Sequence, residues 1–379
     1  MIKVGITGQT GFIGTHLFNT LNLLPDRFKT VPFEDGFFEN EEALKRFVRS
    51  CDAIVHLAAM NRHNNPTVIY DTNIELVKRL INACVRSNVS PHILFSSSIQ
   101  EDQGNLYGKS KKEGRELLDK WAIEHNGKFT GLVIPNVFGP FGQPYYNSVV
   151  ATFCHQLTHD EQPKINVDGE INLIYVGEVV KEIIRYIEAM QYEIRTGSFS
   201  DTVTLSQYTS VKVSRLLEKL LDYKNNYFSS GIIPDLSNPF DRDLFNTFLC
   251  YADHESLFPY FFNQNTDERG SFVEILKSNS KGQFSYSTTK PGITRGNHFH
   301  TRKAERFAVI KGRARIELRR VGTDKILSFE LDGNKPSFVD MPIWFTHNIT
   351  NAGDDDLYTL FWISEFFDPD DLDTYYEKV

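Results

Sequence analysis

The sequence predicts a doubly wound parallel α/β sheet followed by a smaller all-β domain of two sheets. Short apolar strands alternate with amphipathic helices over the first two thirds of the chain, as in parallel sheets covered by helices. Alternating strand-like segments without helices recur from Ser271 to Trp362, which is the rhythm of a β-barrel or jelly roll. Between these two parts, residues 223–259 show no regular alternation of apolar and polar residues. We therefore expect a linker near residues 245–260 and domains at residues 1–250 and 251–379.

The composition narrows the class of protein. A chain of 379 residues is too long for one ordinary core, and its 40% hydrophobic and 24% charged residues are those of a globular protein. The net charge of −8 argues against nucleic acid as a partner. The 4 cysteines show no paired spacing, no signal peptide precedes the first strand, and no apolar run approaches membrane-spanning length. We therefore expect a soluble, cytoplasmic protein without a membrane partner.

The first 24 residues carry a phosphate-binding pattern. The strand expected at Ile2–Thr7 runs directly into Gly8, Gly11 and Gly14, and a helix is expected from Thr15 to Leu24. Strand, glycine loop and helix in this order let the backbone approach a pyrophosphate at a helix N-terminus, which predicts a Rossmann-type dinucleotide site.

The remaining elements follow in alternation. Strands are expected at residues 28–33, 53–59, 92–98, 129–135, 165–167 and 172–175, and helices at residues 73–86, 108–124, 147–157, 177–190 and 211–221. In the last third, strands are expected at residues 271–276, 284–288, 307–310, 314–319, 325–331, 338–341 and 358–362.

Tyr107 and Lys111 are the candidate catalytic residues of the first domain. They are four residues apart and therefore share one face of a helix. A nearby ammonium lowers the pKa of a phenol, and such a tyrosine can exchange a proton with a substrate oxygen. The run Ser96 to Ser98 at the end of a strand can hold the same oxygen by a hydrogen bond. A solvated helix face is the plain alternative for the Tyr-x-x-x-Lys spacing alone, but the glycine loop and serine strand argue against it.

The choice of nicotinamide cofactor stays open between NADH and NADPH. Glu34 and Asp35 follow the second strand, about twenty residues after Gly14, where a carboxylate usually accepts a hydrogen bond from the ribose 2′-hydroxyl. A carboxylate there favours NAD and repels a 2′-phosphate.

The last third contains a candidate metal site. His298 and His300 share one face of a strand, Glu305 follows five residues later, and His347 lies in a second strand-like segment. Three imidazoles and a carboxylate suit zinc, and also iron, nickel or manganese. The spacing Gly292, His298, His300, Glu305 and Gly312 resembles the first cupin motif, and Pro342, His347 and Asn351 resemble the second. Trp344 and Pro336 stand where cupins usually have glycine, which bears on turn geometry.

The motifs of the first domain together resemble an extended short-chain dehydrogenase/reductase acting on nucleotide sugars. These motifs are the glycine loop, His56-Leu-Ala-Ala59, the three serines, Tyr107-x-x-x-Lys111 and Pro135-Asn-Val-Phe-Gly139. The resemblance implies that Tyr107 is the catalytic acid/base and that Lys111 holds the nicotinamide ribose. It implies that Ser98 is the third catalytic residue, with Ser97 as the alternative. Val133 replaces the arginine that often precedes the last motif, which puts one substrate contact in doubt. The implied cofactor-binding residues are Gly8, Thr10, Gly11, Phe12, Ile13, Gly14, Asp35, Leu57, Ala58, Ala59, Tyr107, Lys111, Pro135, Asn136 and Val137.

The pairing of reductase and cupin resembles the bifunctional enzymes of capsular-polysaccharide synthesis over nearly the whole chain, for example at Asp267-x-Arg-Gly-Ser-Phe272 and Thr346-His-Asn-Ile349. In that family the cupin inverts C3 of a UDP-2-acetamido-2,6-dideoxy-4-hexulose and the reductase then reduces the C4 ketone. The product is UDP-2-acetamido-2,6-dideoxy-L-talose, on the path to UDP-N-acetyl-L-fucosamine. The resemblance implies one divalent metal such as Zn²⁺ and a homodimer. It also implies NADPH as the cofactor, although that family binds NADPH through a basic residue at the position where this chain has Pro32-Phe33. Two alternatives are a single-activity 4-keto reductase with a structural cupin and a non-catalytic sugar-nucleotide sensor.

Overall fold

The computed structural model describes residues 1–192 and 197–379, and these residues pack into two units. The first unit contains residues 1–138, 142–149 and 170–211, and the second contains residues 139–141, 150–169 and 212–379. Packing thus groups residues 212–250 with the second unit, while the domain boundary expected at residue 250 remains a prediction. Among the described residues, every helix is too short or too polar to cross a membrane.

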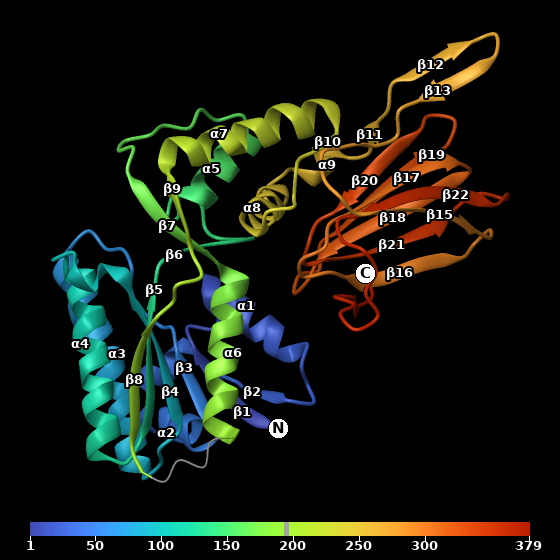
Figure 1. Cartoon of the computed structure of the whole chain (residues 1–379). Helices are drawn as coiled ribbons and strands as arrows, with labels where there is room; N and C mark the ends of the chain where they lie inside the picture. Colours follow the sequence, from blue (N-terminus) through green and yellow to red (C-terminus); the bar gives the residue numbers. More distant parts are fainter. Residues whose placement is uncertain (193–196) are drawn as a thin grey trace. The chain divides into compact units, whose positions relative to one another are not determined.

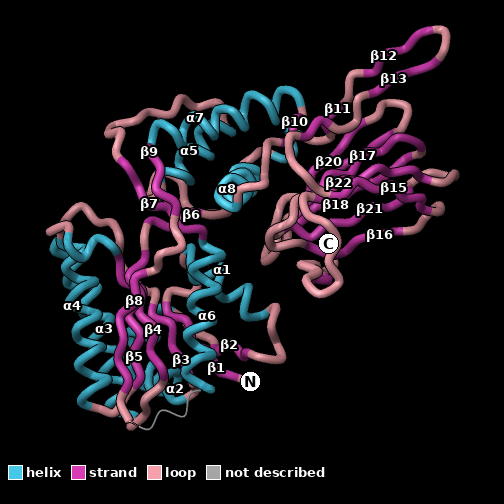
Figure 2. The backbone as a smooth tube through the Cα atoms, viewed as in Figure 1, coloured by secondary structure: helices cyan, strands magenta, loops and turns pink. Residues whose placement is uncertain are grey.

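The first unit is built on a six-stranded sheet in the order β2-β1-β3-β4-β5-β8, and every neighbouring pair is parallel (Figures 1 and 2). The strands are β1 (Ile2–Thr7), β2 (Phe28–Val31), β3 (Ala53–His56), β4 (His92–Ser98), β5 (Lys128–Ile134) and β8 (Phe199–Thr204). The predicted doubly wound parallel sheet is confirmed. A second sheet in this part of the chain has the order β6-β7-β9, formed by β6 (Asn136–Phe138), β7 (Glu170–Tyr175) and β9 (Thr209–Lys212).

Helices cover both faces of the six-stranded sheet, and each face has its own apolar core. On one face, α1 (Phe12–Asn22) and α6 (Val176–Tyr192) bury Leu17 and Ile183 against β1. On the other, α2 (Glu41–Arg49), α3 (Pro66–Ser87) and α4 (Leu106–Glu124) bury Val77 and Trp121 against β3 and β4. Two short 3-10 helices, η1 (Asp35–Glu39) and η2 (Ile99–Asp102), follow β2 and β4.

Helix α3 begins seven residues before the predicted start at residue 73. The Asn65 side chain accepts a hydrogen bond from the Thr67 amide, and Pro66 occupies the first turn, where its missing N–H costs nothing. The capping residues, rather than the apolar period, thus set this boundary.

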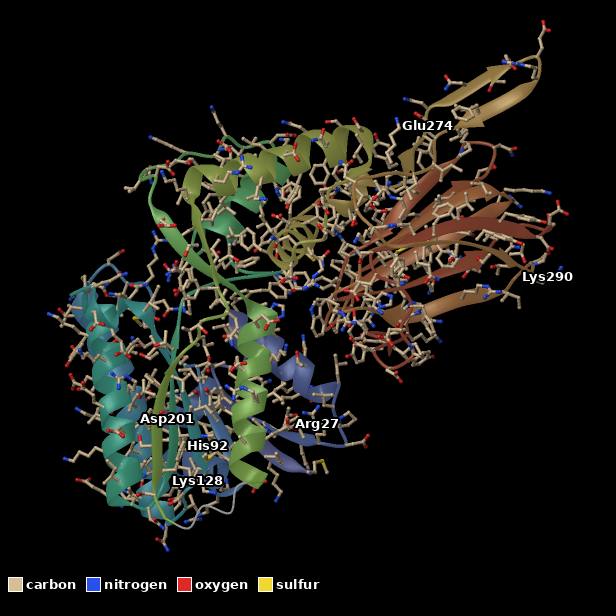
Figure 3. The ribbon with its side chains drawn as sticks, viewed as in Figure 1. Arg27, His92, Lys128, Asp201, Glu274 and Lys290 are labelled. Atoms are coloured by element: carbon tan, nitrogen blue, oxygen red, sulfur yellow. The ribbon has the colours of Figure 1, made fainter. Side chains whose placement is uncertain are left out.

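His92 is a buried histidine of the sheet that lies outside both candidate sites (Figure 3). It lies in β4 opposite Lys128 of β5, and its Nε2 is 2.9 Å from the Thr130 hydroxyl oxygen. Burial lowers the pKa of His92 to about 3, so the imidazole is neutral and belongs to the core.

The second unit contains a helical part that the sequence analysis did not predict in full. Its helices are α5 (Val149–Thr158), α7 (Val213–Tyr223), the π-helical turn η3 (Lys224–Phe228), α8 (Pro239–Leu249) and α9 (His254–Leu257). Residues 223–259 are therefore largely helical although their sequence shows no helical period, and the linker expected near residues 245–260 remains a prediction. From Asp243 to Leu249 every residue of α8 is buried, including the polar residues Asn246 and Thr247, so over this part of the helix burial does not follow the polarity of the sequence. The strand expected at residues 165–167 is absent, since these described residues have no regular structure.

The rest of the second unit is the predicted two-sheet β domain. One antiparallel sheet has the order β11-β20-β17-β22-β15 and the other β19-β18-β21-β16-β23. The first comprises β11 (Tyr260–Phe261), β20 (Ser337–Met341), β17 (Glu305–Lys311), β22 (Leu357–Ile363) and β15 (Gln283–Thr289), and the second β19 (Ile326–Asp332), β18 (Arg313–Arg320), β21 (Phe345–Asn351), β16 (Thr294–Phe299) and β23 (Tyr375–Tyr376). Smaller pairs are formed by β12 (Gln264–Asp267) with β13 (Gly270–Val273) and by β10 (Ile232–Ile233) with β14 (Lys277–Ser278). Apolar side chains of β17, β18 and β20 form the core, among them Val309, Ile316 and Phe338.

Candidate active site and metal centre

A cavity of about 710 Å³ in the first unit collects nearly all of the residues predicted to bind a dinucleotide. The predicted residues that line it are Gly8, Thr10, Gly11, Phe12, Ile13, Gly14, Asp35, Leu57, Ala58, Ala59, Ser98, Tyr107, Lys111, Pro135 and Val137. Asn136 does not line it, because its side-chain amide turns to the Asn172 backbone oxygen, 3.3 Å away.

The glycine loop forms one end of the cavity and is closely packed. Gly8 has a φ of 71°, a left-handed conformation that favours glycine. A Cβ atom at Gly14 would lie 2.2 Å from the Gly8 carbonyl oxygen, so a larger residue there would open the loop. Gly11 precedes the first turn of α1, whose free amide groups and positive dipole end can receive a phosphate. The loop therefore fits a pyrophosphate.

Tyr107 and Lys111 lie together in the first turns of α4, as their spacing predicts. The Lys111 Nζ is 5.7 Å from the centre of the Tyr107 ring and donates a hydrogen bond of 2.9 Å to the Ser96 backbone oxygen. The expected lowering of the pKa of Tyr107 is wrong for this geometry. Burial raises the pKa of Tyr107 to about 12 and lowers the pKa of Lys111 to about 8. Because the ammonium is directed at Ser96 rather than at the phenol oxygen, burial outweighs its attraction.

The serines at the end of β4 differ in their partners. The buried Ser97 hydroxyl donates a hydrogen bond to Glu101, whose carboxylate also pairs with Arg115 at 2.8 Å. The Ser98 hydroxyl oxygen instead accepts a hydrogen bond of 3.2 Å from the Gln100 amide, so its own hydrogen can still be donated. Ser98 is thus the better placed of the two to bind a substrate oxygen.

The sequence prediction missed a buried network that joins the cavity wall to the candidate catalytic helix. Asn73 accepts a hydrogen bond of 2.7 Å from the Met60 amide and donates one of 3.1 Å to the Met60 oxygen. It also donates to the Ser110 hydroxyl at 3.0 Å, and Ser110 donates to the Tyr107 backbone oxygen at 2.7 Å. No local signal marks Asn73, since only the fold brings α3 and α4 together. The residues that line the cavity and were missed are Phe38, Glu39, Met60, Asn61, Thr72, Leu76 and Ile134.

Two carboxylates line the cavity after β2. Asp35 and Glu39 belong to η1, and Lys111 is the only lysine or arginine among the described residues that line the cavity. Arg79 lies behind this wall and pairs with Glu39 at 2.7 Å and with Glu75 at 2.8 Å.

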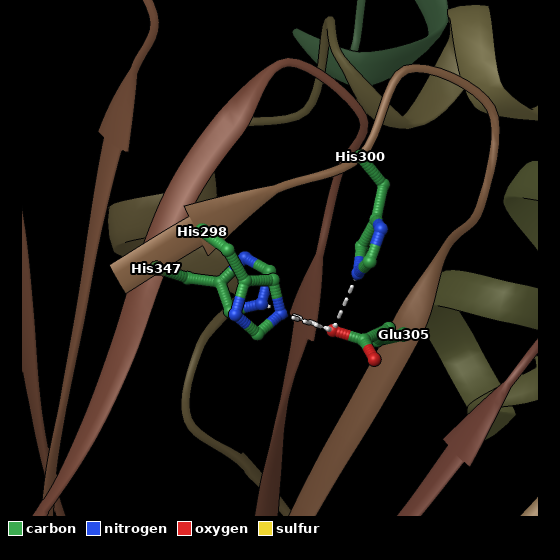
Figure 4. A group of neighbouring side chains, drawn as sticks. All are labelled: His298, His300, Glu305 and His347. Atoms are coloured by element: carbon green, nitrogen blue, oxygen red, sulfur yellow. Dashed lines mark ion pairs between the residues drawn. The ribbon is translucent and has the colours of Figure 1, made fainter. Parts of the chain in front are cut away.

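The four predicted metal ligands meet inside the β domain (Figure 4). Their candidate donor atoms all lie within 4.8 Å of one another. The Glu305 Oε2 is 3.0 Å from the Nε2 of His347, 3.3 Å from that of His300 and 3.8 Å from that of His298. His298 and His347 face each other across β16 and β21, whereas Glu305 begins β17 in the other sheet. The cluster therefore joins the two sheets.

The chemistry of these donors fits a metal ion. The His347 Nε2, His300 Nε2 and Glu305 Oε2 atoms are buried and have no hydrogen-bond partner among the described residues. His347 Nδ1 is 3.1 Å from the Phe345 backbone oxygen and His300 Nδ1 contacts the Asp373 backbone oxygen, so both rings direct Nε2 inward. Burial alone would raise the pKa of Glu305, but the three imidazoles hold it well below its usual value. An ionised carboxylate among inward-facing imidazoles is a ligand set for a divalent cation such as Zn²⁺.

Two turns position the candidate ligands, and one of them contains Trp344, a departure from the expected cupin motif. The β16–β21 register shifts between Gly296 and His298, and Asn297 at the shift has a φ of 60°. This bulge brings His298 opposite His347. Trp344, which replaces a usual glycine, keeps the left-handed φ of 61°, and its amide donates a hydrogen bond of 2.8 Å to the His300 oxygen. The turn therefore keeps its shape without the glycine.

The fold and the cavity define a nicotinamide-dependent class of protein. Residues 4–195 match the NAD dependent epimerase/dehydratase family, and the chain belongs to this family. Residues 265–375 match the polysaccharide biosynthesis C-terminal domain.

Relatives with both parts are known. The chain is 35% identical over 381 residues to UDP-2-acetamido-2,6-beta-L-arabino-hexul-4-ose reductase of Pseudomonas aeruginosa, covering 99% of this chain and 98% of the relative. The crystal structure of the capsular polysaccharide assembling protein CapF from Staphylococcus aureus is similar with a TM-score of 0.63 and 36% identity, covering 100% of both chains. RMD from Pseudomonas aeruginosa, complexed with NADPH, covers 59% of this chain and 83% of its own at 19% identity with a TM-score of 0.51, and shares the fold. The predicted resemblance to capsular-polysaccharide enzymes is confirmed.

Proposed function

We propose that this protein is a bifunctional nucleotide-sugar enzyme. Its β domain inverts C3 of a UDP-2-acetamido-2,6-dideoxy-4-hexulose, and its parallel α/β part reduces the C4 ketone to UDP-2-acetamido-2,6-dideoxy-L-talose, on the path to UDP-N-acetyl-L-fucosamine. One observation carries the proposal: a single chain holds both a Tyr107–Lys111 cavity and a His₃Glu cluster in which all members but His298 are buried. The full-length similarity to a 4-hexulose reductase supports the choice of substrate class.

The reduction uses the residues around Tyr107. A bound nicotinamide supplies the hydride for the C4 carbon. The Tyr107 hydroxyl donates its proton to the C4 oxygen, and its raised pKa of about 12 means that this proton is present at neutral pH. Ser98 donates a second hydrogen bond to the same oxygen. Lys111 holds the ribose, and its link to the Ser96 oxygen fixes it relative to the serine strand.

The order of the two reactions follows from the chemistry of the sugar. A C4 ketone acidifies the proton at C3, so C3 must be inverted before reduction removes the ketone. His298, His300, Glu305 and His347 would hold one divalent cation, which supplies Lewis acidity to polarise a keto oxygen if one coordination position stays open. If all four ligands close the shell, the cation is structural.

The choice between NADH and NADPH depends on the carboxylate of Asp35. Asp35 and Glu39 line the cavity where the adenosine ribose of such folds binds, and both would repel a 2′-phosphate. The two carboxylates support NADH as the cofactor, whereas the resemblance to the capsular-polysaccharide enzymes supports NADPH. The remaining proposals are a UDP-linked 4-keto-6-deoxy-N-acetylhexosamine as substrate, a homodimer and a cytoplasmic location.

The test is to incubate the protein in D₂O with a UDP-4-keto-6-deoxy-N-acetylhexosamine and either NADH or NADPH, and to examine the product by NMR. The proposal expects inverted configuration and deuterium at C3, together with a hydroxyl at C4. A C4 alcohol with the original C3–H bond would support the second candidate, a single-activity reductase with a structural β domain. Absence of any reaction with either cofactor would contradict both and favour a sugar-nucleotide sensor.

A further inference from the structure

The C-terminal segment Asp371–Tyr376 packs directly against the part of the β domain that carries the metal ligands. The two ligands His300 and Glu305 are joined by a short loop, residues 301–304. In sequence, Asp373 is 73 residues from His300, yet its backbone oxygen contacts the His300 Nδ1. The connection therefore exists only in the folded protein.

The Asp373 carboxylate binds this loop through four hydrogen bonds. Its Oδ1 accepts from the Thr301 amide at 3.1 Å and from the Thr301 hydroxyl at 2.6 Å. Its Oδ2 accepts from the Arg302 amide at 3.0 Å and from the Lys303 amide at 3.2 Å. One buried carboxylate thus fixes three consecutive backbone amides between the two ligands.

Asp373 is itself held in an unusual conformation. Its φ is 41°, in the left-handed region that aspartate enters only at a cost, and its side chain is buried. Such a conformation persists only where surrounding contacts outweigh the strain, and here the four hydrogen bonds to the loop provide them.

Charged side chains of the same loop hold the neighbouring residues of the C-terminal segment. The Lys303 Nζ donates a hydrogen bond of 2.8 Å to the Leu372 backbone oxygen. Arg302 pairs with Asp371 at 2.7 Å and with Glu365 at 3.1 Å. Farther along, Tyr376 of β23 pairs with His298 of β16, so a third ligand of the cluster also lies on a strand bordered by this segment.

We propose that the segment Asp371–Tyr376 is a clasp that sets the affinity of the His₃Glu site for its metal, with Asp373 as its positioning residue. The inference rests on the proposed metal site and adds to it a determinant outside the ligands. The His300 ring is oriented by the Asp373 carbonyl, and the loop to Glu305 is fixed by the Asp373 carboxylate. Groups that orient metal ligands in this way typically contribute 10–100-fold to metal affinity.

The test uses the full-length protein, Zn²⁺ alone and a colorimetric chelator. Asp373→Asn places an amide NH₂ against the backbone amides of the loop, and we expect Zn²⁺ to bind about 10–100-fold more weakly and to dissociate correspondingly faster. Asp370→Asn is the matched control, since it removes the same charge from an exposed residue of the adjoining chain, and its affinity should equal that of the unchanged protein.

The outcomes separate the clasp from the metal site itself. If the unchanged protein binds no Zn²⁺ or other divalent ion, the metal site is wrong. If it binds Zn²⁺ and Asp373→Asn binds equally well, the clasp is wrong, even if the variant unfolds at a lower temperature. Should Asp373→Asn fail to fold, Thr301→Val decides the matter, because it removes only the 2.6 Å hydroxyl bond. That variant should release Zn²⁺ several-fold faster, and an unchanged release rate would overturn the proposal.

Discussion

The Lys111 ammonium donates a hydrogen bond of 2.9 Å to the backbone oxygen of Ser96. This contact ties the first turns of α4 to the end of β4, which are 15 residues apart in the chain. Tyr107 is half-buried and lines the same cavity as the serine strand, and its raised pKa keeps it protonated, as a general acid for a ketone would need to be.

Tyr107→Phe should reduce ketone reduction by about 10²–10⁴-fold, the usual contribution of a general acid. Dinucleotide binding should change little, because the ring and its packing are kept. Single-turnover hydride transfer and nucleotide titration measure the two effects. Hydride transfer at the normal rate would assign the acid to another residue.

The pH dependence of the reductase should reflect Lys111. Burial lowers the pKa of Lys111 to about 8, so its positive charge is present below that pH and is lost as the pH rises through about 8. We expect kcat/KM for the ketone to fall over this range. Lys111→Met should lower kcat/KM and remove this step from the pH profile. A step that persists in Lys111→Met would belong to a different group.

Asp35→Ser should shift cofactor preference toward NADPH, because it removes the carboxylate that would repel a 2′-phosphate. The ratio of kcat/KM for NADPH to that for NADH measures the shift. Glu34→Ser is the control, since Glu34 does not line the cavity and its replacement should leave the ratio unchanged. Equal ratios for both variants would contradict the assignment of Asp35.

His298→Ala should empty the metal site while leaving the nicotinamide cavity intact. Elemental analysis should find about one divalent ion per chain before the change and a substoichiometric amount after it. His159→Ala removes an exposed histidine outside the cluster and should keep the metal. Full metal content in His298→Ala would show that the ion binds elsewhere.

Asp340→Ala should strongly destabilise the second unit. Asp340 pairs with buried Arg306 through bonds of 2.7 and 2.9 Å and accepts a hydrogen bond from Tyr227. Removing one partner of a buried ion pair typically costs about 3–5 kcal/mol. Urea unfolding followed by near-UV circular dichroism checks this, with the exposed Asp332→Ala as control. Equal midpoints for the two variants would mean that the buried pair contributes no net stability.

Local sequence determined those features whose physics is local. The glycine loop, the Tyr107–Lys111 spacing and the His298–His300 pair depend on geometry over a few residues, and the structure places them as expected. Alternating strands such as β18 and β19 could also be predicted, because buried and more exposed residues alternate along them.

Tertiary structure alone decided the rest. Residues Asp243–Leu249 of helix α8 are buried on every side, the polar Asn246 and Thr247 included, so no exposed polar face marks this part of the chain as a helix. The pKa of Tyr107 rises rather than falls, because burial depends on the whole fold and outweighs a lysine four residues away. Asn73 bonds to Ser110 at a sequence separation of 37 residues, and Asp373 bonds to Thr301, in the loop between two proposed metal ligands, at a separation of 72. Contacts over such separations leave no periodic trace in a sequence, because they are specified by how sheets and helices pack rather than by how neighbouring residues alternate.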